Sequence, residues 1–138
     1  MSINQSTRTP VKSTRTAKSM IGRIWFGRTR ADRADEYLDY NAREGVAAIA
    51  AKPGCLGVQQ FRTIRGDVAE FTVISYWPSI EAMKAMHDDD GDPMRVWPLD
   101  RDAEFLLELP EFVEITELFI NDWHDDVLKM RAQKARAA

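Results

Sequence analysis

The sequence predicts an α+β fold of the ferredoxin-like type, in which strands and helices follow one another in the order β-α-β-β-α-β. Segments 20–28, 56–64 and 68–77 are rich in aromatic and β-branched residues, as strands are. Between the first two, segment 32–51 has apolar residues at steps of three and four, which is typical of an amphipathic helix. With a second helix and a fourth strand further along, two helices are expected to cover one face of a four-stranded sheet.

The first half of this pattern has clear boundaries. Gly27 and Thr29 close the first strand, and Pro53 and Gly54 end the long helix. The apolar stripe that we expect to face the sheet consists of Ala34, Leu38, Ala42, Val46 and Ile49. The Arg-Gly-Asp segment at 65–67 has the composition of a hairpin turn, so the second and third strands are expected to be antiparallel neighbours.

The second half of the chain is less regular. Ser79 can accept hydrogen bonds from the first turn of a short helix at 79–87, and Glu81 suits the positive end of that helix. Segment 88–98 contains four Asp, two Pro and one Gly, so we expect a loop there. Three elements then complete the pattern, namely a short helix, the fourth strand and a C-terminal helical extension, at 99–107, 111–120 and 121–138.

Length and composition indicate one domain, at 20–120, between two extensions. The chain has 138 residues, of which 44% are apolar and 30% charged, as in globular domains. Segment 1–19 is rich in Ser and Thr and has basic but no acidic residues, so we expect a disordered basic tail. The alternatives for this segment are a transit peptide, a nucleic-acid tether, or a true start at Met20.

Charge, hydropathy and cysteine content exclude several classes of protein. The net charge of −3 is unlike that of a nucleic-acid-binding protein. No apolar run reaches the roughly 18 residues of a membrane helix, and no signal-peptide core lies near the N-terminus. The single cysteine, Cys55, excludes an intrachain disulfide and a multi-cysteine metal site. We therefore expect a cytoplasmic protein with neither nucleic acid nor membrane as a partner.

Both faces of the predicted sheet are apolar. In the third strand, Phe71, Val73 and Trp77 alternate with Ile74 and Tyr76. Two helices can cover only one face of four strands, so the other face needs a different cover. The simplest cover is the same face of a second copy, which predicts a homodimer.

Four short segments carry a resemblance to a known family. They are Met20-Ile21-Gly22-Arg23-Ile24-Trp25, Pro53-Gly54-Cys55-Leu56-Gly57, Ser75-Tyr76-Trp77-Pro78-Ser79 and Phe112-Val113-Glu114. Over roughly 20–120 the sequence resembles the uncharacterised branch of the antibiotic biosynthesis monooxygenase-like family, in the dimeric α/β-barrel superfamily. These segments mark strand ends and turns, so the resemblance supports the fold more strongly than the function.

The resemblance implies oxidation of aromatic compounds by O₂ without metal or flavin, so no cofactor is expected. Other family members degrade haem with an Asn on the first strand, a Trp on the second helix and a His beyond it. This sequence lacks that Asn, has Met83 and Met86 in place of the Trp, and has His87 too early, which disfavours haem degradation. Ile115 and Thr116 replace the His-Tyr pair that many relatives have in the last strand.

Cofactor-free oxygenation requires an apolar cavity with a few groups that stabilise the substrate anion. Arg23 and Arg62 are the candidate cations; the alternative is that both form ion pairs with Glu114 or Glu117 across the sheet. The residues expected to shape the substrate pocket are Trp25, Ser75, Trp77, Trp97 and Thr116. The first two tryptophans have an alternative role as core or interface residues, and the third is either a lid or the anchor of its loop.

His87 is the candidate general base, because the pKa of an unperturbed imidazole lies near neutrality. Its alternative role is to stabilise the C-terminal end of a helix beside Asp88, Asp89 and Asp90. These acids lack the spacing of a calcium loop, so no metal site is predicted. Nothing in the sequence near Cys55 would activate its thiol.

The leading functional hypothesis is a cofactor-independent monooxygenase, or a related oxidoreductase, that acts on a small hydrophobic aromatic or quinone-like molecule. The alternatives are a non-catalytic small-molecule-binding or structural homodimer of the same fold and, less favoured, a haem-binding protein. A cavity of at least about 300 Å³ beside Arg23, Arg62 and Trp77 would favour the enzyme. Filling of that space by tryptophan and methionine side chains would favour the non-catalytic alternative.

Overall fold

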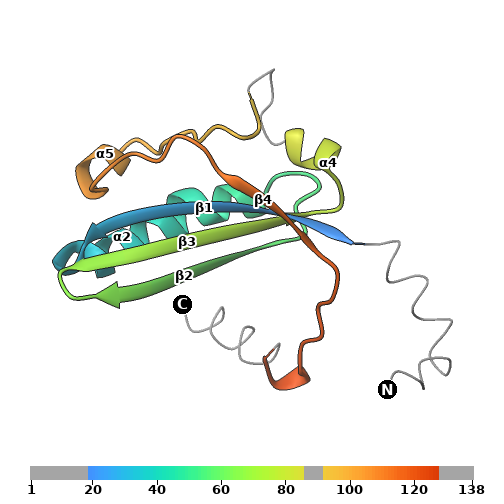
Figure 1. Cartoon of the computed structure of the whole chain (residues 1–138), viewed down its shortest axis with the longest axis horizontal. Coiled ribbons are helices and arrows are strands. Elements are labelled where there is room, and N and C mark those ends of the chain that lie inside the picture. The colour runs from blue at the N-terminus through green and yellow to red at the C-terminus, as the bar shows by residue number, and fades with distance from the viewer. Residues whose placement is uncertain (1–18, 86–91, 128–138) are drawn as a thin grey trace, which may run out of the picture.

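The computed structural model describes residues 19–85 and 92–127, which form an antiparallel four-stranded sheet with helices on one face (Figure 1). The strands lie in the order β2-β3-β1-β4, which is that of the ferredoxin-like fold. The predicted α+β fold class is therefore confirmed. The strand bounds, from β1 to β4, are Met20–Arg30, Gly57–Arg65, Val68–Trp77 and Glu114–Leu118.

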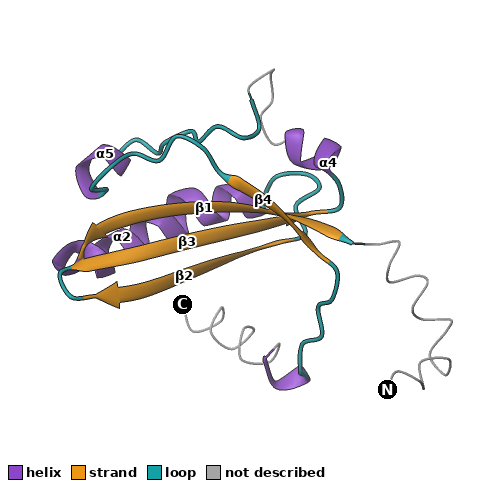
Figure 2. Cartoon of the chain, viewed as in Figure 1, coloured by secondary structure: helices purple, strands orange, loops and turns teal. Residues whose placement is uncertain are grey.

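The predicted long helix is one continuous helical run of mixed winding, which Figure 2 shows behind the sheet. It begins in a 3-10 turn and passes through a π-helical turn between two α-helices. The four parts, η2, α2, η3 and α3, are Ala31–Arg33, Ala34–Asn41, Ala42–Val46 and Ala47–Ala50.

Where the structure describes the second half of the chain, it contains less helix than the sequence predicts. Helix α4 spans Ile80–Lys84 and helix α5 spans Asp102–Phe105, against predictions of 79–87 and 99–107. Residues 86 and 87 lie outside the described part of the chain. Between these helices, residues 92–101 contain no helix; this extended segment runs above β1 in Figure 1. Extended chain thus takes part of the covering role expected of a second helix.

Strand β4 is also shorter than predicted, because its expected first residues pair elsewhere. Phe112 forms an isolated bridge with Arg95, and the Val113 amide donates to the carbonyl of Met94 at 2.8 Å. These contacts join the start of β4 to the extended segment rather than to β1. Of the predicted C-terminal extension at 121–138, the structure describes residues 121–127, which end in one helical turn.

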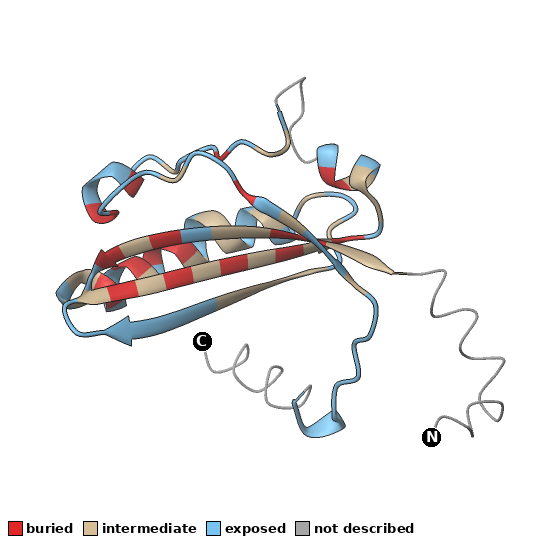
Figure 3. Ribbon diagram, viewed as in Figure 1, coloured by how far each residue is buried: buried red, intermediate tan, exposed pale blue. Residues whose placement is uncertain are grey.

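The buried side chains form two clusters on the helix-covered face of the sheet. The larger cluster contains Tyr37, Tyr40, Phe71 and Phe105 among its aromatic members. The smaller is built on Trp77 and Met83. Figure 3 shows the alternation of buried and half-buried positions along β3. This alternation means that the two faces of the sheet have different surroundings.

The buried face of α2 differs from the predicted apolar stripe. Ala34 is buried as expected, but Tyr37 and Tyr40 fill the core, whereas Leu38 and Val46 are only half-buried. A tyrosine can be buried without penalty where its hydroxyl finds a partner. Both hydroxyls do so, since that of Tyr37 donates to Asp102 and that of Tyr40 accepts from the Arg101 amide, each at 2.9 Å.

None of the helices η2 to α5 covers the opposite face of the sheet, where Phe61 shares a cavity with Trp123 and Val127 of the C-terminal segment. Residues of β1, β2 and β3 form a cross-strand row on it, with Phe26 and Phe61 on either side of Thr72. Both phenylalanines are 46% exposed. Large apolar side chains at this exposure leave an apolar surface on the outer face.

The predicted helix cap at Ser79 is confirmed. Its hydroxyl accepts a hydrogen bond from the Ala82 amide at 3.1 Å, and Glu81 lies in the first turn of α4. The cap satisfies one of the free amide groups at the start of a short helix. That helix places Met83 against Trp77.

Replacing Ser79 by Ala should lower the free energy of unfolding by about 1 kcal/mol, because the Ala82 amide loses its acceptor. Ser79→Asp retains an acceptor oxygen and should stay close to the wild type. Urea denaturation of the three proteins at equal concentration measures the difference. Equal stability of the Ala variant and the wild type would contradict the role of this cap.

Candidate functional site

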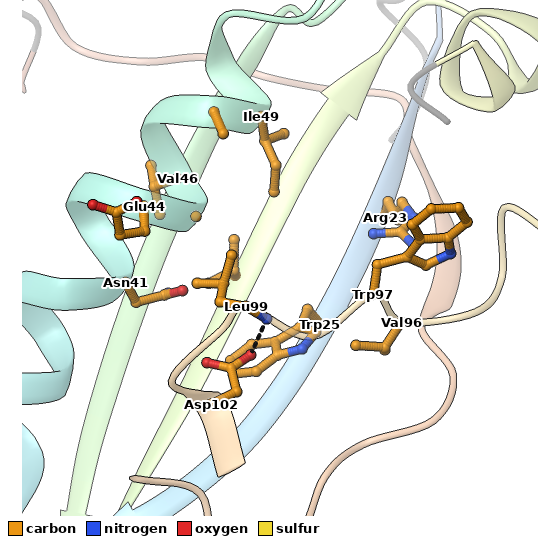
Figure 4. Close-up of a pocket in the computed structure, with 13 residues that line it drawn as sticks. Arg23, Trp25, Asn41, Glu44, Val46, Ile49, Val96, Trp97, Leu99 and Asp102 are labelled. Atoms are coloured by element: carbon orange, nitrogen blue, oxygen red, sulfur yellow. Dashed lines mark hydrogen bonds between the residues drawn. The ribbon is translucent and has the colours of Figure 1, made fainter. Parts of the chain in front are cut away.

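A half-open cavity of about 150 Å³ lies between the helical run and the sheet (Figure 4). Its wall is mostly apolar, with a few charged and amide groups. The cavity is lined by Arg23, Trp25, Asn41, Glu44, Gly45, Val46, Ala48, Ile49, Val73, Val96, Trp97, Leu99 and Asp102. Its volume is below the roughly 300 Å³ at which ordinary ligand pockets begin.

The cavity occupies the interval between the two buried clusters. Along the helix-covered face of β3, Phe71 belongs to one cluster, Trp77 to the other, and Val73 between them lines the cavity. Val73 is the β3 residue that pairs with Trp25 of β1. The cavity is therefore a gap in the core between two packed regions.

Trp25 forms one wall because Gly27 leaves room for its ring. A Cβ atom at Gly27 would lie 2.5 Å from Cη2 of Trp25, closer than van der Waals contact allows. The indole thus lies along its own strand, over the glycine two residues further on. This position brings the ring to the cavity rather than to the outer face of the sheet.

Arg23 supplies a buried positive charge beside the cavity. The residue is 6% exposed, and its guanidinium donates from Nε to the carbonyl of Pro93 and from Nη2 to that of Arg95, both at 3.0 Å. Within residues 19–85 and 92–127, no carboxylate forms an ion pair with it. Two carbonyl oxygens occupy only part of the five donor hydrogens of an arginine.

Burial lowers the pKa of Arg23 to about 10, because the charged form loses hydration. The side chain therefore remains positive at neutral pH. A buried cation without a carboxylate partner is stabilised by an anion that enters its surroundings. The alternative in which Arg23 and Arg62 bind Glu114 or Glu117 is wrong, since Arg62 pairs with Asp35 at 2.7 Å.

Asp102 is a buried acid on the cavity wall. Its residue is 3% exposed, and its two oxygens accept from the Tyr37 hydroxyl and from the Leu99 amide, each at 2.9 Å. Burial raises the pKa of Asp102 and outweighs these two hydrogen bonds, which favour the anion. Burial, and after it the negative charge of Asp102, raises the pKa of Tyr37. This phenol therefore stays protonated and donates.

The helical run contributes Asn41 and Glu44 to the cavity, and neither was expected as a site residue from the sequence. Asn41 is 6% exposed and its Nδ2 donates to Oε1 of Gln60 at 2.7 Å. Glu44 lies within the π-helical turn η3, and Asn41 directly precedes it; such a turn changes the direction in which successive side chains point. The one sequence signal was Gly45, an unusual residue in the middle of a helix.

The structure brings Arg23, Trp25 and Trp97 together among the predicted site residues. Trp97 is 52% exposed and lines the cavity from the extended segment. Two other candidates, Ser75 and Trp77, lie on the same sheet face in the buried core, where the Trp77 indole donates to the Ser75 hydroxyl at 2.9 Å.

Three further candidates lie away from the cavity. Arg62 lies on β2, opposite Phe71, and forms its ion pair with Asp35 there. Thr116 pairs with Gly22 and therefore occupies the opposite face of the sheet from Arg23. His87 lies outside the described residues. Of the two predicted cations, Arg23 therefore lines the cavity and Arg62 does not.

Residues 19–85 and 92–127 contain no helix that is long and apolar enough to span a membrane. The same residues contain no group of three or more His, Cys, Asp or Glu side chains arranged to hold a metal ion.

The raised pKa of Asp102 predicts how stability varies with pH. A carboxyl whose pKa is higher in the folded than in the unfolded state favours folding when protonated, so its contribution is lost as pH rises from its usual 3.8 through the folded value. The wild type should therefore lose free energy of unfolding relative to Asp102→Asn over this interval. Chemical denaturation of both proteins across a pH series measures it, and parallel curves would contradict the expectation.

Comparisons with known proteins agree with this fold. A family model described as antibiotic biosynthesis monooxygenase matches residues 20–91. A Nitrosomonas europaea protein of unknown function superposes with a TM-score of 0.54 and 13% identity, covering 78% of this chain and 97% of its own. A candidate antibiotic biosynthesis monooxygenase of the same organism gives 0.50 and 13%, covering 72% and 88%.

At these identities the two structures show the likeness of fold alone. Among the curated proteins, none matches this chain. The family model carries the assignment, because the residues that it matches make up more than half of the sequence and include β1, the helical run, β2, β3 and α4. The chain belongs to the antibiotic biosynthesis monooxygenase family.

Proposed function

We propose that this protein is a monooxygenase that acts on a small phenol-like substrate without a tightly bound cofactor, and that Arg23 binds the substrate oxyanion. One observation carries the proposal: a buried guanidinium lines an apolar cavity and, in the described part of the chain, has carbonyls but no carboxylate as partners. Membership of the family supports the reaction class.

The proposed chemistry needs the charge of Arg23. A free phenol has a pKa of about 10, and a nearby cation in a desolvated site favours the phenolate. The phenolate is electron-rich and gives an electron to O₂ more readily than the neutral phenol. For a phenol with a free ortho or para carbon, one substrate and one O₂ yield one quinone and one water. The substrate itself supplies the electrons, so no further reductant is required.

The size of the cavity limits the substrate. A closed apolar cavity of roughly 150 Å³ holds one benzene molecule. The cavity beside Arg23 has about this volume, and its walls include Trp25, Val73 and Leu99. We therefore propose a single aromatic ring as the part of the substrate that is enclosed, with any larger substituent outside the opening.

The volume is below the roughly 300 Å³ expected of an enzyme pocket, and neither Arg62 nor Trp77 lines the cavity. Both observations favour a second candidate, a non-catalytic binding protein for the same class of ligand. This candidate makes the same use of Arg23 in binding but predicts no O₂ consumption. Binding and turnover therefore have to be measured separately.

Replacing Arg23 by Met should reduce O₂ consumption with single-ring phenols by about 100-fold or more, the usual effect of removing one oxyanion-stabilising donor. Arg23→Lys should fall between the two, because it keeps the charge but loses the planar fork. An oxygen electrode measures turnover, and calorimetry in the absence of O₂ measures binding. Unchanged turnover in Arg23→Met would refute the proposal.

Arg65→Gln is the matched control, since this arginine pairs with Glu70 near the hairpin and lies away from the cavity. It should behave as the wild type. Thermal unfolding of each variant identifies any loss that results from misfolding. Binding that depends on Arg23 without O₂ consumption in the wild type would favour the non-catalytic candidate.

We further propose that the protein forms a homodimer through the outer face of its sheet. The support is the exposed row of Phe26 and Phe61, in a sheet whose helices η2 to α5 lie on the other side. Burial of apolar surface contributes about 25 cal/mol per Å², so covering two phenylalanines per copy favours association.

Phe61→Lys should weaken this dimer, because two lysines would be buried or brought together at the interface. Ile64→Lys is the control: it lies on the other face of β2 at a similar exposure, 49% against 46%. Sedimentation velocity should show a monomer for the first variant and a dimer for the second. A wild-type monomer at all concentrations would contradict the proposed assembly.

A further inference from the structure

The π-helical turn η3 is the one irregular part of the helical run that faces the cavity. It spans Ala42–Val46 and contributes Glu44, Gly45 and Val46 to the lining. Single π-turns within α-helices occur frequently at functional sites. Asn41, the last residue of α2, precedes this turn directly and also lines the cavity.

Asn41 has an unusual hydrogen-bonding state for a buried amide. Its Nδ2 donates to Gln60 on β2, which fixes the orientation of the side chain. Its Oδ1 accepts no hydrogen bond from any described residue, although the residue is 6% exposed. Buried acceptors are normally satisfied, so an acceptor on a cavity wall that no described residue pairs with is suited to accept from a bound ligand.

Gly45 creates the space in which this oxygen lies. A Cβ atom there would be 2.6 Å from Oδ1 of Asn41 and 3.2 Å from Cδ1 of Leu99. Any other residue would thus push the amide from its place or close this side of the cavity. Glycine disfavours helical structure, and it stands in this helix at the point where a larger side chain would fill the cavity.

Asn41 and Arg23 lie on opposite walls. Figure 4 shows the Asn41 amide pointing from the helical run toward the cavity and Arg23 on the strand at the far side. One wall therefore offers donors and a positive charge. The other offers the buried neutral acceptor of Asn41, beside the exposed carboxylate of Glu44, which pairs with Arg43 at 3.7 Å. Asp102 is a weaker candidate for that acceptor, because both its oxygens already accept hydrogen bonds.

We propose that Asn41 is a specificity-determining residue, whose Oδ1 accepts a hydrogen bond from a hydroxyl or amino group on the edge of the ring remote from Arg23. This inference rests on the proposed function, since it assumes that a ring oxyanion is bound at Arg23. The preferred ligand is then a single ring with an acidic hydroxyl at one edge and a hydrogen-bond donor at the other.

The test compares two probes of nearly equal shape, hydroquinone and 4-methylphenol. They differ only in the group opposite the first hydroxyl, which is a hydroxyl in hydroquinone and a methyl group in 4-methylphenol. In a purely apolar pocket the methyl compound binds more tightly, because it is easier to desolvate. With an acceptor at Asn41 the order is reversed, because the methyl compound leaves Oδ1 unpaired. Calorimetry without O₂ should give at least about tenfold tighter binding of hydroquinone.

Two variants assign the preference to Asn41. Asn41→Leu should reverse it in favour of 4-methylphenol. Gly45→Ala keeps the amide but displaces it, and should reduce the preference while favouring the helix through the higher propensity of Ala. If the first variant does not fold, the second still tests the assignment. Gln59→Leu removes an amide from the same strand as Gln60, one that accepts from Tyr76, and should keep the wild-type ratio.

The outcomes separate the two proposals. Equal affinity for both probes, or tighter binding of 4-methylphenol by the wild type, overturns the role of Asn41 and leaves Arg23 untouched. Failure of the wild type to bind either probe overturns the proposed function and this inference with it. A preference that persists in both Asn41→Leu and Gly45→Ala assigns the acceptor elsewhere and overturns the inference.

Discussion

The hydrogen bonds of Arg23 to two backbone carbonyls determine the shape of the cavity. The guanidinium lies on the central strand β1 and holds the extended segment at Pro93 and Arg95. The next residues of that segment, Val96, Trp97 and Leu99, then form the cavity wall. A single buried charge thus joins two parts of the chain about 70 residues apart, since its partners lie 70 and 72 positions further along. Because the partners of that charge among residues 19–85 and 92–127 are carbonyl oxygens and not carboxylates, the same contact that shapes the cavity also makes it attractive to an anion.

The strands and the sheet topology were predictable because they depend on local composition and on alternation. Segment 68–77 was predicted as a strand with Phe71, Val73 and Trp77 on one face, and the structure confirms both. The helical face was not predictable in the same way. Tyr37 is buried because its hydroxyl meets Asp102, 65 residues away in sequence, and no local pattern reveals that partner.

The site was predictable only in part, and for a related reason. Arg23 and Trp25 were identified because a cation and an aromatic side chain on a predicted strand suit a pocket that binds an aromatic anion. Thr116 was placed with them by sequence, but its pairing with Gly22 turns it to the other face, and strand register cannot be derived from one sequence. Asn41 was missed because its position depends on a hydrogen bond to Gln60, 19 residues further along the chain, which no local pattern reveals.

Strand β1 bears two surfaces at once, with Arg23 and Trp25 toward the cavity and Ile24 and Phe26 toward the outer face. Because successive side chains alternate, an insertion or deletion of one residue would exchange these two sets along the rest of the strand. Insertions and deletions are therefore not tolerated in β1, whereas the hairpin turn at 65–67 can tolerate them. The strand can adapt to a new ligand only by substitution, one residue at a time, and each substitution leaves the opposite surface as it was.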